Sequence, residues 1–416
     1  MAFVEIMSPV GSYESLIAAI QGGADSVYFG VGKLNMRSRS SQNFSLDDLD
    51  KIIDIARQSN IKTYLTLNTV IFDADMAEMQ QTVDRAKDAG ITAIIASDMS
   101  VIEYAHKRGL EVHISTQSNI TNLIAVKFFS KYADVMVTAR ELNLEQVSDI
   151  VRGIEEHKII GPFGKPVRLE LFVHGALCMA VSGKCYLSLD NMNYSANRGA
   201  CLQLCRRAYT VKDKDEGYEL DIDNEYIMSP KDLCTIEFLD KIIGVGVKVL
   251  KIEGRGRGPE YVKTVTRVYR QAADSVLNGT YAPQKVDEWM AQLRGVYNRG
   301  FWDGYYLGRK MGEWSKQYGS QATHRKVYVG KVTNYFSNLG VVEVKMESHD
   351  LSINENILVI GPTTGVVELK PDEIRVNLET VPDTRKGEMC SFKVPQLVRR
   401  GDMVYKMVPD MGSVKK

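Results

Sequence analysis

Residues 63–115 read TYLTLNTVIFDADMAEMQQTVDRAKDAGITAIIASDMSVIEYAHKRGLEVHIS, and their pattern decides the fold. Three short runs, Thr63–Asn68, Ala93–Ser97 and Glu111–Ser115, are rich in apolar and β-branched residues. The segments between them have the apolar spacing of amphipathic helices, and Asp73 gives a start signal for the first of them. Short apolar runs bounded by polar segments are typical of buried strands. The stretch therefore predicts a strand–helix unit that repeats.

The same alternation extends over the first 255 residues. Further strands are predicted at Val4–Met7, Ser26–Gly30, Asp134–Thr138, Arg168–His174 and Val247–Glu253. Helices are predicted at positions that include Tyr13–Gln21, Leu46–Ser59, Asp75–Asp88 and Leu144–Glu156. Eight strands, nearly all separated by helices, predict an α/β fold of the (β/α)8 TIM-like barrel type. An open doubly wound sheet is the alternative, but the first strand is followed by SPVGS at 8–12 and not by a Gly-rich dinucleotide turn.

The texture changes towards the C-terminus. Residues 326–412 contain about seven short alternating runs with turn residues between them, which predicts a small all-β barrel domain. We expect three parts: a barrel over 1–282 with a cysteine-rich insertion after its seventh strand, a connecting segment over 283–325 that closes the barrel, and the β-barrel over 326–412. Cys390 begins a strand of the last part and is expected to be a core residue.

Composition and charge exclude few functions. The chain has 416 residues, 44% hydrophobic and 25% charged, with 52 basic and 52 acidic side chains. A balanced total does not indicate a polyanionic partner, although a basic face can exist within it. The N-terminus lacks the features of a signal peptide, and no run reaches the roughly 18 apolar residues of a membrane span. We therefore expect a cytoplasmic protein with no membrane partner and no DNA partner.

The chemistry of the chain is concentrated in residues 170–207, ELFVHGALCMAVSGKCYLSLDNMNYSANRGACLQLCRR. Four of the six cysteines, Cys178, Cys185, Cys201 and Cys205, lie here, and Cys234 follows. Reduced cysteines gathered in a cytosolic protein indicate a metal or catalytic site more often than disulfides. Zinc sites favour closely paired cysteines, whereas iron–sulfur clusters tolerate irregular spacing. An iron–sulfur cluster is favoured, with zinc, a reactive thiolate and inert core cysteines as alternatives.

Active sites of TIM-like barrels lie in the loops after the strand C-termini, and these loops carry polar and charged residues here. The expected anion-binding or substrate-binding residues are Arg37, Arg39, Asn68, Gln117, Arg255 and Arg257. The expected catalytic residues are His174, Glu170 and Arg140. The last strand runs into EGRGRGPEY at 253–261, where glycines and a helix N-terminus suit an anion. Arg255 and Arg257 would supply bidentate contacts to carboxylate or phosphate.

The run ELFVHGALCMAVSGKCYLS at 170–188 resembles the signature of the collagenase-like peptidases, unclassified-peptidase family thirty-two. NRGAC at 197–201 and the KIEGR run at 251–255 continue the resemblance. Several members of that family are iron–sulfur proteins that act in hydroxylation of tRNA, ribosomal RNA or ubiquinone. By resemblance, a [4Fe–4S] cluster would be held by Cys178, Cys185, Cys201 and Cys234, with Cys205 as the alternative to Cys201.

The length and the appended β domain make the chain most like the prephenate-dependent tRNA uridine hydroxylation proteins. This resemblance implies hydroxylation of wobble uridine to 5-hydroxyuridine, with prephenate as oxygen source and tRNA as partner. It also implies a related partner subunit or a homo-oligomer.

Two other functions remain open. A collagenase-like peptidase could use a Cys–His pair made of His174 and Cys178, but no HExxH or GxSxG motif is present. A scaffold subunit with a structural cluster is the third possibility.

Overall fold

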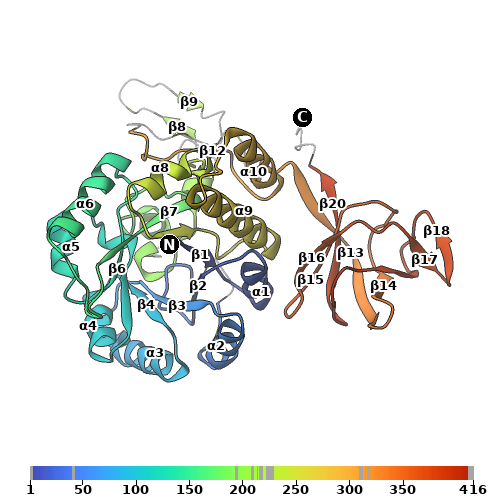
Figure 1. Cartoon of the computed structure of the whole chain (residues 1–416), viewed down its shortest axis with the longest axis horizontal. Helices are drawn as coiled ribbons and strands as arrows, with labels where there is room; N and C mark the ends of the chain where they lie inside the picture. Colours follow the sequence, from blue (N-terminus) through green and yellow to red (C-terminus); the bar gives the residue numbers. More distant parts are fainter. Residues whose placement is uncertain are drawn as a thin grey trace.

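The computed structural model describes residues 3–39, 43–192, 195–207, 210–212, 214, 219–221, 229–308, 313, 315 and 319–410. Figure 1 shows a barrel surrounded by helices and, beside it, a separate β domain formed by the C-terminal part of the chain. None of the described helices is both long enough and apolar enough to cross a membrane.

The barrel contains eight parallel strands in chain order. They are β1 (Glu5–Pro9), β2 (Ser26–Gly30), β3 (Lys62–Leu67), β4 (Ala93–Ala96), β5 (Glu111–Ile114), β6 (Val135–Val137), β7 (Arg168–Gly175) and β11 (Val249–Ile252). β11 closes the barrel because it pairs in parallel with both β1 and β7, with Val249 opposite Glu5 and Glu170. The predicted (β/α)8 architecture is confirmed.

Helices cover the outside of the barrel (Figure 1). They are α1 (Tyr13–Gln21), α2 (Leu49–Gln58), α3 (Met76–Ala89), α4 (Met99–Lys107), α5 (Leu123–Phe129), α6 (Leu144–Glu156), α8 (Leu239–Gly244), α9 (Pro259–Leu277) and α10 (Pro283–Gly295). Several begin at side-chain caps, which satisfy backbone N–H groups that have no partner within the helix. Ser12 accepts from Ser15 N, and Asn143 forms a capping box with Gln146. α2 begins three residues later than expected because 46–48 form a 3₁₀ turn.

A long insertion separates β7 from β11. It contains α7 (Leu187–Met192), two 3₁₀ turns at Ala196–Arg198 and Leu204–Arg206, and the hairpin of β8 (Thr210–Lys212) and β9 (Glu219–Asp221). It ends in β10 (Asp232–Cys234), which runs antiparallel to β7 and is joined by β12 (Phe301–Trp302). Because the insertion leaves the barrel at the C-terminal end of β7, its first part, with Cys178, Cys185, Cys201 and Cys205, lies at the barrel mouth.

The C-terminal domain is one eight-stranded antiparallel sheet in the order β16-β15-β20-β13-β14-β19-β17-β18. Its strands are β13 (His324–Phe336), β14 (Val341–Met346), β15 (Ile357–Gly361), β16 (Gly365–Leu369), β17 (Ile374–Val376), β18 (Glu379–Val381), β19 (Met389–Lys393) and β20 (Met403–Pro409). Cys390 is buried in its core beside Val344 and Phe392, so the prediction that it is a core residue is confirmed.

The two domains touch along α1 and α9. The Gln21 side chain donates to Thr364 O at 2.9 Å and accepts from Val366 N at 3.0 Å. Lys263 on α9 pairs with Glu368 on β16 at 3.1 Å. These contacts lie on the outer helices, so the β domain leaves the barrel mouth free of its own strands.

Candidate functional site

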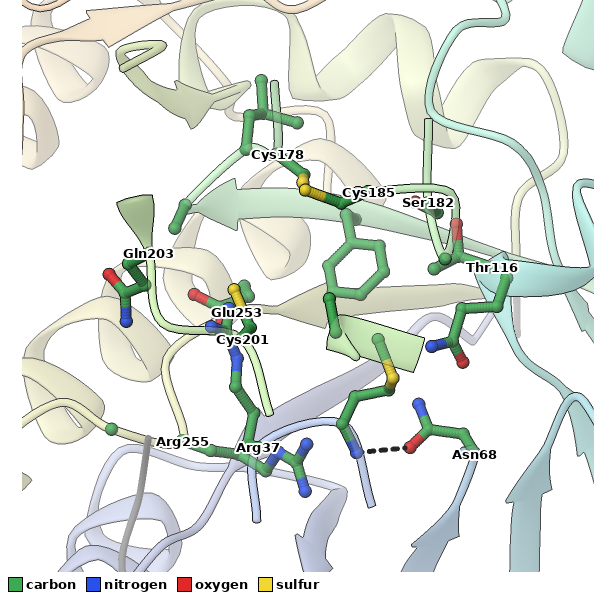
Figure 2. Close-up of a pocket in the computed structure, with 18 of the residues that line it drawn as sticks. Arg37, Asn68, Thr116, Cys178, Ser182, Cys185, Cys201, Gln203, Glu253 and Arg255 are labelled. Atoms are coloured by element: carbon green, nitrogen blue, oxygen red, sulfur yellow. Dashed lines mark hydrogen bonds and ion pairs between the residues drawn. The ribbon is translucent and has the colours of Figure 1, made fainter. Parts of the chain in front are cut away.

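A cavity of about 260 Å³ lies at the C-terminal mouth of the barrel. Strand ends and the loops after them line one side, and the insertion after β7 lines the other (Figure 2). We call the four insertion cysteines that line it, Cys178, Cys185, Cys201 and Cys205, the roof. We call the three charged residues at the end of β11, Lys251, Glu253 and Arg255, the floor.

The roof thiols are close enough to influence one another. Burial, with smaller contributions from the thiols of Cys178, Cys201 and Cys185, raises the pKa of Cys205 to about 11 in spite of the opposing charge of Arg206. Burial likewise raises the pKa of Cys185, with a smaller contribution from Cys178. Figure 2 shows the sulfur atoms of Cys178 and Cys185 directed towards each other, and both thiols are free.

The roof places four thiols around one cavity, and thiolates are the ligands that an iron–sulfur cluster requires. Within the described ranges, no group of three or more His, Cys, Asp or Glu side chains is arranged to hold one metal ion. All thiolates of a zinc site bind one ion, with zinc–sulfur bonds of about 2.3 Å. The four thiolates of a [4Fe–4S] cluster bind four separate irons, so their sulfur atoms lie further apart. Four cysteines around one cavity therefore fit the cluster implied by the resemblance.

The structure does not bring Cys234 to the roof. Cys234 is 7% exposed and is not among the cavity-lining residues. Its thiol lies 3.8 Å from Met290 Sδ and 3.9 Å from the Tyr269 hydroxyl, and burial raises its pKa to about 12. The expected set of Cys178, Cys185, Cys201 and Cys234 is therefore not assembled, because β10 pairs with β7 and turns this side chain into the core. Cys205, the expected alternative to Cys201, lines the cavity together with Cys178, Cys185 and Cys201.

Hydrogen bonds from the rim hold the roof in place. Arg206 donates to Leu177 O at 2.8 Å and to Pro230 O at 2.9 Å, which ties the two ends of the insertion together. Val70 N donates to Asn197 O at 3.0 Å, so the loop after β3 supports the segment before Cys201.

The cavity is strongly cationic. Among its described lining residues, seven are cationic and one, Glu253, is a carboxylate. The cations are Arg37, Arg140, Arg206, Lys251, Arg255, Arg257 and Arg299. Burial opposes ionisation of Glu253, but Arg37, at 2.8 Å, and Arg257 outweigh it and lower its pKa to about 2. An excess of buried positive charge favours an anionic ligand.

Arg255, an expected anion-binding residue, lies in the lining of the cavity. Its guanidinium donates to Thr66 Oγ1 at 2.8 Å and to Asn35 Oδ1 at 3.2 Å, and burial lowers its pKa to about 10. Arg257 also lines the cavity and stacks on the Tyr297 ring at 3.6 Å. The neighbouring Gly254 has φ +157°, and a Cβ there would lie 2.6 Å from the Tyr261 ring, so the turn requires glycine.

Of the other expected anion-binding residues, three line the cavity and one does not. Arg37, Asn68 and Gln117 line the cavity, and Asn68 Oδ1 accepts from Met36 N at 3.2 Å (Figure 2). Arg39 does not, because it is exposed on the loop after β2. Its inclusion among the site residues is therefore not supported by the structure.

Of the three expected catalytic residues, the structure brings only Arg140 to the cavity. Arg140 lies over the Phe172 ring at 3.8 Å and donates to Ala176 O at 3.0 Å. Glu170 is fully buried beneath the floor, where it accepts from Lys251 Nζ at 2.6 Å. His174 is buried among Tyr261, Tyr269 and Phe301 and lies outside the cavity lining. Burial lowers the pKa of His174 to about 3, which makes its ring a weak base, and its Nδ1 lies 3.4 Å from the Tyr269 hydroxyl.

Sequence reasoning missed Lys251, Arg206 and Arg299 and did not assign a role to Glu253. A signal for two of them was present: Lys251 and Glu253 are two residues apart in the predicted strand Val247–Glu253, and alternate residues of a strand point to the same face. Charged residues at alternate positions of an otherwise apolar strand indicate a polar barrel interior. Arg299 lies just before β12, far in sequence from the barrel strands. Its position at the cavity depends on the pairing of β12 with β10.

Comparisons with known proteins agree with this site. The sequence model of peptidase family U32 matches residues 11–316. A protein named Collagenase from Porphyromonas gingivalis is 58% identical over 402 residues, covering 97% of each chain. tRNA hydroxylation protein P1 from Bacillus subtilis is 30% identical over 415 residues, covering 97% of this chain and 93% of its own. The 23S rRNA 5-hydroxycytidine synthase of Escherichia coli is 35% identical over 275 residues, covering 66% of this chain and 40% of its own.

The resemblance found in the cysteine-rich stretch is thereby confirmed, and the relatives carry the names of peptidase-type proteins and of RNA hydroxylation proteins. The family match covers more than half of the chain, including every cavity-lining residue. The chain therefore belongs to peptidase family U32.

Proposed function

We propose that this protein is an iron–sulfur enzyme that hydroxylates wobble uridine in tRNA to 5-hydroxyuridine, with prephenate as the oxygen source. The observation that carries the proposal is the combination of four thiols and seven cations around one cavity. A relative named for tRNA hydroxylation aligns over almost the whole chain, which supports the same reaction class.

Cys178, Cys185, Cys201 and Cys205 would hold a [4Fe–4S] cluster, which supplies one-electron redox chemistry when it is bound. Arg206 and the contacts between the insertion and the rim keep these thiols at the mouth. Iron binding deprotonates a coordinating thiol, so the raised pKa of Cys205 does not prevent ligation.

The floor would hold the carboxylates of prephenate. Arg255 is fixed by Thr66 and Asn35 and needs no rearrangement to meet an anion. Arg257 adds positive charge from the same turn and Arg140 from the loop after β6, and each is stacked on an aromatic ring that fixes its plane. Pre-positioned guanidinium groups lose little entropy on binding, which favours a bidentate carboxylate contact.

The RNA would approach the roof from the outside. A base in the anticodon loop is single-stranded and can be extruded into a pocket at low cost. Tyr186, next to the ligand Cys185, is 75% exposed and offers an aromatic surface on which such a base can stack. A partner subunit or homo-oligomer and a cytoplasmic location remain predictions.

The competing proposal is a collagenase-like peptidase, which the name of the 58% identical relative favours. The site gives it weaker support. His174 lies outside the cavity lining and its lowered pKa makes it a weak general base for Cys178, and the remaining roof thiols have no role in peptide hydrolysis.

The decisive experiment starts with protein purified without oxygen. We expect a broad absorption band in the violet and about four irons and four sulfides per chain. The protein is then expressed in a host that lacks its own tRNA hydroxylases, and tRNA nucleosides are analysed by mass spectrometry. Appearance of 5-hydroxyuridine is expected. Iron-free protein that cleaves collagen and leaves tRNA unchanged would overturn the proposal in favour of the peptidase.

A further inference from the structure

Beneath the cavity floor, a row of buried charges runs through the barrel interior. Lys251 Nζ lies 2.6 Å from Glu170 Oε1. The other oxygen of Glu170 lies 3.4 Å from His113 Nδ1, and His113 Nε2 lies 3.4 Å from Glu111 Oε1. The side chains of Glu170 and His113 are 0% exposed and that of Lys251 is 5% exposed. Only Lys251 reaches the cavity lining.

Burying ionisable groups costs free energy of desolvation, and apolar side chains would fill the same core without that cost. The two ring nitrogens of His113 face two carboxylates, while each contact is longer than an ordinary hydrogen bond. The arrangement places alternating charges in line and ends at a single ammonium in the ligand cavity. Such coupling between titratable groups is characteristic of sites that transfer protons.

We propose that Lys251 is the acid–base residue of the cavity and that Glu170 and His113 are positioning residues that set its proton affinity. In the step, one N–H bond of the Lys251 ammonium breaks and one O–H bond forms on the bound anion. The resulting amine regains its proton from solvent, and no electrons move. The assignment does not depend on the identity of the anion, and only its last test uses the proposed hydroxylation.

The groups around Lys251 make its titration sensitive to changes in this row. Burial lowers the pKa of Lys251, Glu170 opposes that effect, and Arg255 and Arg140 add to it. The rings of Tyr28 and Phe172 lie 4.6 and 5.3 Å from the ammonium.

Glu170 is shared with His113. Burial favours the neutral form of His113, but Glu111 and Glu170 outweigh it and raise its pKa, with the Tyr64 ring packed alongside. When protonated, His113 is a second cation that competes with Lys251 for the charge of Glu170.

The two positioning residues should act in opposite directions. Glu170→Gln removes the counter-charge of a buried ammonium, so the midpoint at which Lys251 deprotonates should fall by about 1 to 3 pH units. His113→Asn removes the competing cation and leaves Glu170 wholly to Lys251, so the midpoint should rise by roughly one unit. A role in packing alone would not produce shifts of opposite sign.

Competitive acetylation with acetic anhydride, read residue by residue by mass spectrometry on the intact folded protein, measures these midpoints without any ligand. Lys107, on the outer surface of α4, serves as the internal control and should not change between variants. Circular dichroism confirms that each variant is folded. A midpoint that is the same in both variants and the unchanged protein, or a Lys251 that never reacts, would overturn the proposal.

Lys251→Arg separates proton transfer from simple attraction, because arginine keeps the charge but does not release a proton. With the iron content unchanged, formation of 5-hydroxyuridine should fall by about 100-fold or more. Full activity in this variant would reduce Lys251 to an anion-binding cation. If no hydroxylation occurs even in the unchanged protein, the proposed function fails while the labelling result still decides the role of Lys251.

Discussion

The roof and the floor of the cavity are built in different ways from the same barrel. The roof cysteines lie in an insertion made of short turns. Arg206 donates to Leu177 O and Pro230 O, Asn197 O accepts from Val70 N, and Arg198 pairs with Asp75 on the rim. The floor residues lie at the end of β11, which pairs with two neighbouring strands. One ion pair fixes Lys251, one fixes Glu253, and two hydrogen bonds fix Arg255. A loop can yield to an inserted cluster, whereas a strand presents charges in fixed positions.

This difference predicts a separation of effects. Changes to roof residues should remove iron and leave the fold and anion binding intact. Changes to floor residues should weaken anion binding or stability and leave the iron in place.

The largest effect is expected from Cys185→Ser. Serine is a poor ligand for iron, and we expect no other side chain of the loop to take the place of the missing thiolate. We expect complete loss of the visible absorption band, with the thermal unfolding midpoint of the metal-free protein unchanged. Cys390→Ser is the matched control and should keep the full band. A full-strength band in Cys185→Ser would remove this residue from the ligand set.

A second pair of variants tests which cysteine is the fourth ligand. Cys205 lines the cavity, whereas Cys234 is held against Met290 and Tyr269 in the core. We expect Cys205→Ser to lose more than half of its bound iron and Cys234→Ser to retain nearly all of it, measured after anaerobic reconstitution. The reverse result would show that β10 moves on cluster binding and would restore the set implied by the family resemblance.

The next effect concerns the floor. Arg255→Met should weaken binding of prephenate by about 10-fold to 100-fold, because a charged hydrogen bond contributes roughly 1.5–3 kcal/mol. Calorimetric titration measures the affinity, and the absorption band should not change. Arg39→Met is the control because Arg39 is exposed and outside the lining. Equal affinity in the two variants would exclude the turn after β11 from the anion site.

The ion pairs of the floor also predict a pH dependence. Arg37 and Arg257 hold the pKa of Glu253 at about 2 against an ordinary value of 4.5, in spite of its burial. Because the folded pKa is the lower one, the stabilisation is complete above about pH 4.5 and is lost as the pH falls towards 2. In metal-free protein, Glu253→Gln should lower the unfolding midpoint at neutral pH and flatten its fall across this window. An identical acid profile in the variant would contradict the assigned ion pairs.

The floor of the cavity could be predicted from the sequence better than the roof could. Strand positions were predictable because apolar runs of four to six residues recur between capped helices, and Ser26–Gly30 has the predicted bounds. Arg255 and Arg257 were predictable because glycines and a strand end marked their turn. The position of Cys234 was not, because it depends on β10 pairing antiparallel with β7, a contact between segments about 60 residues apart. The row from Lys251 to His113 was not predicted either, because its side chains come from three different strands. No local sequence pattern indicates that they lie together.

The smallest effect is expected from Cys390→Ser, the control for the roof variants. The Cys390 side chain lies in an apolar core of the β domain with Val344 and Phe392, and burial raises its pKa to about 12. A serine hydroxyl in that place loses its hydrogen bonds to water, which costs about 1–3 kcal/mol of unfolding free energy. Denaturant titration should show this loss, while iron content and anion affinity stay at their original values. A loss of iron in this variant would mean that the β domain supports the roof, and the separation between the two regions would then fail.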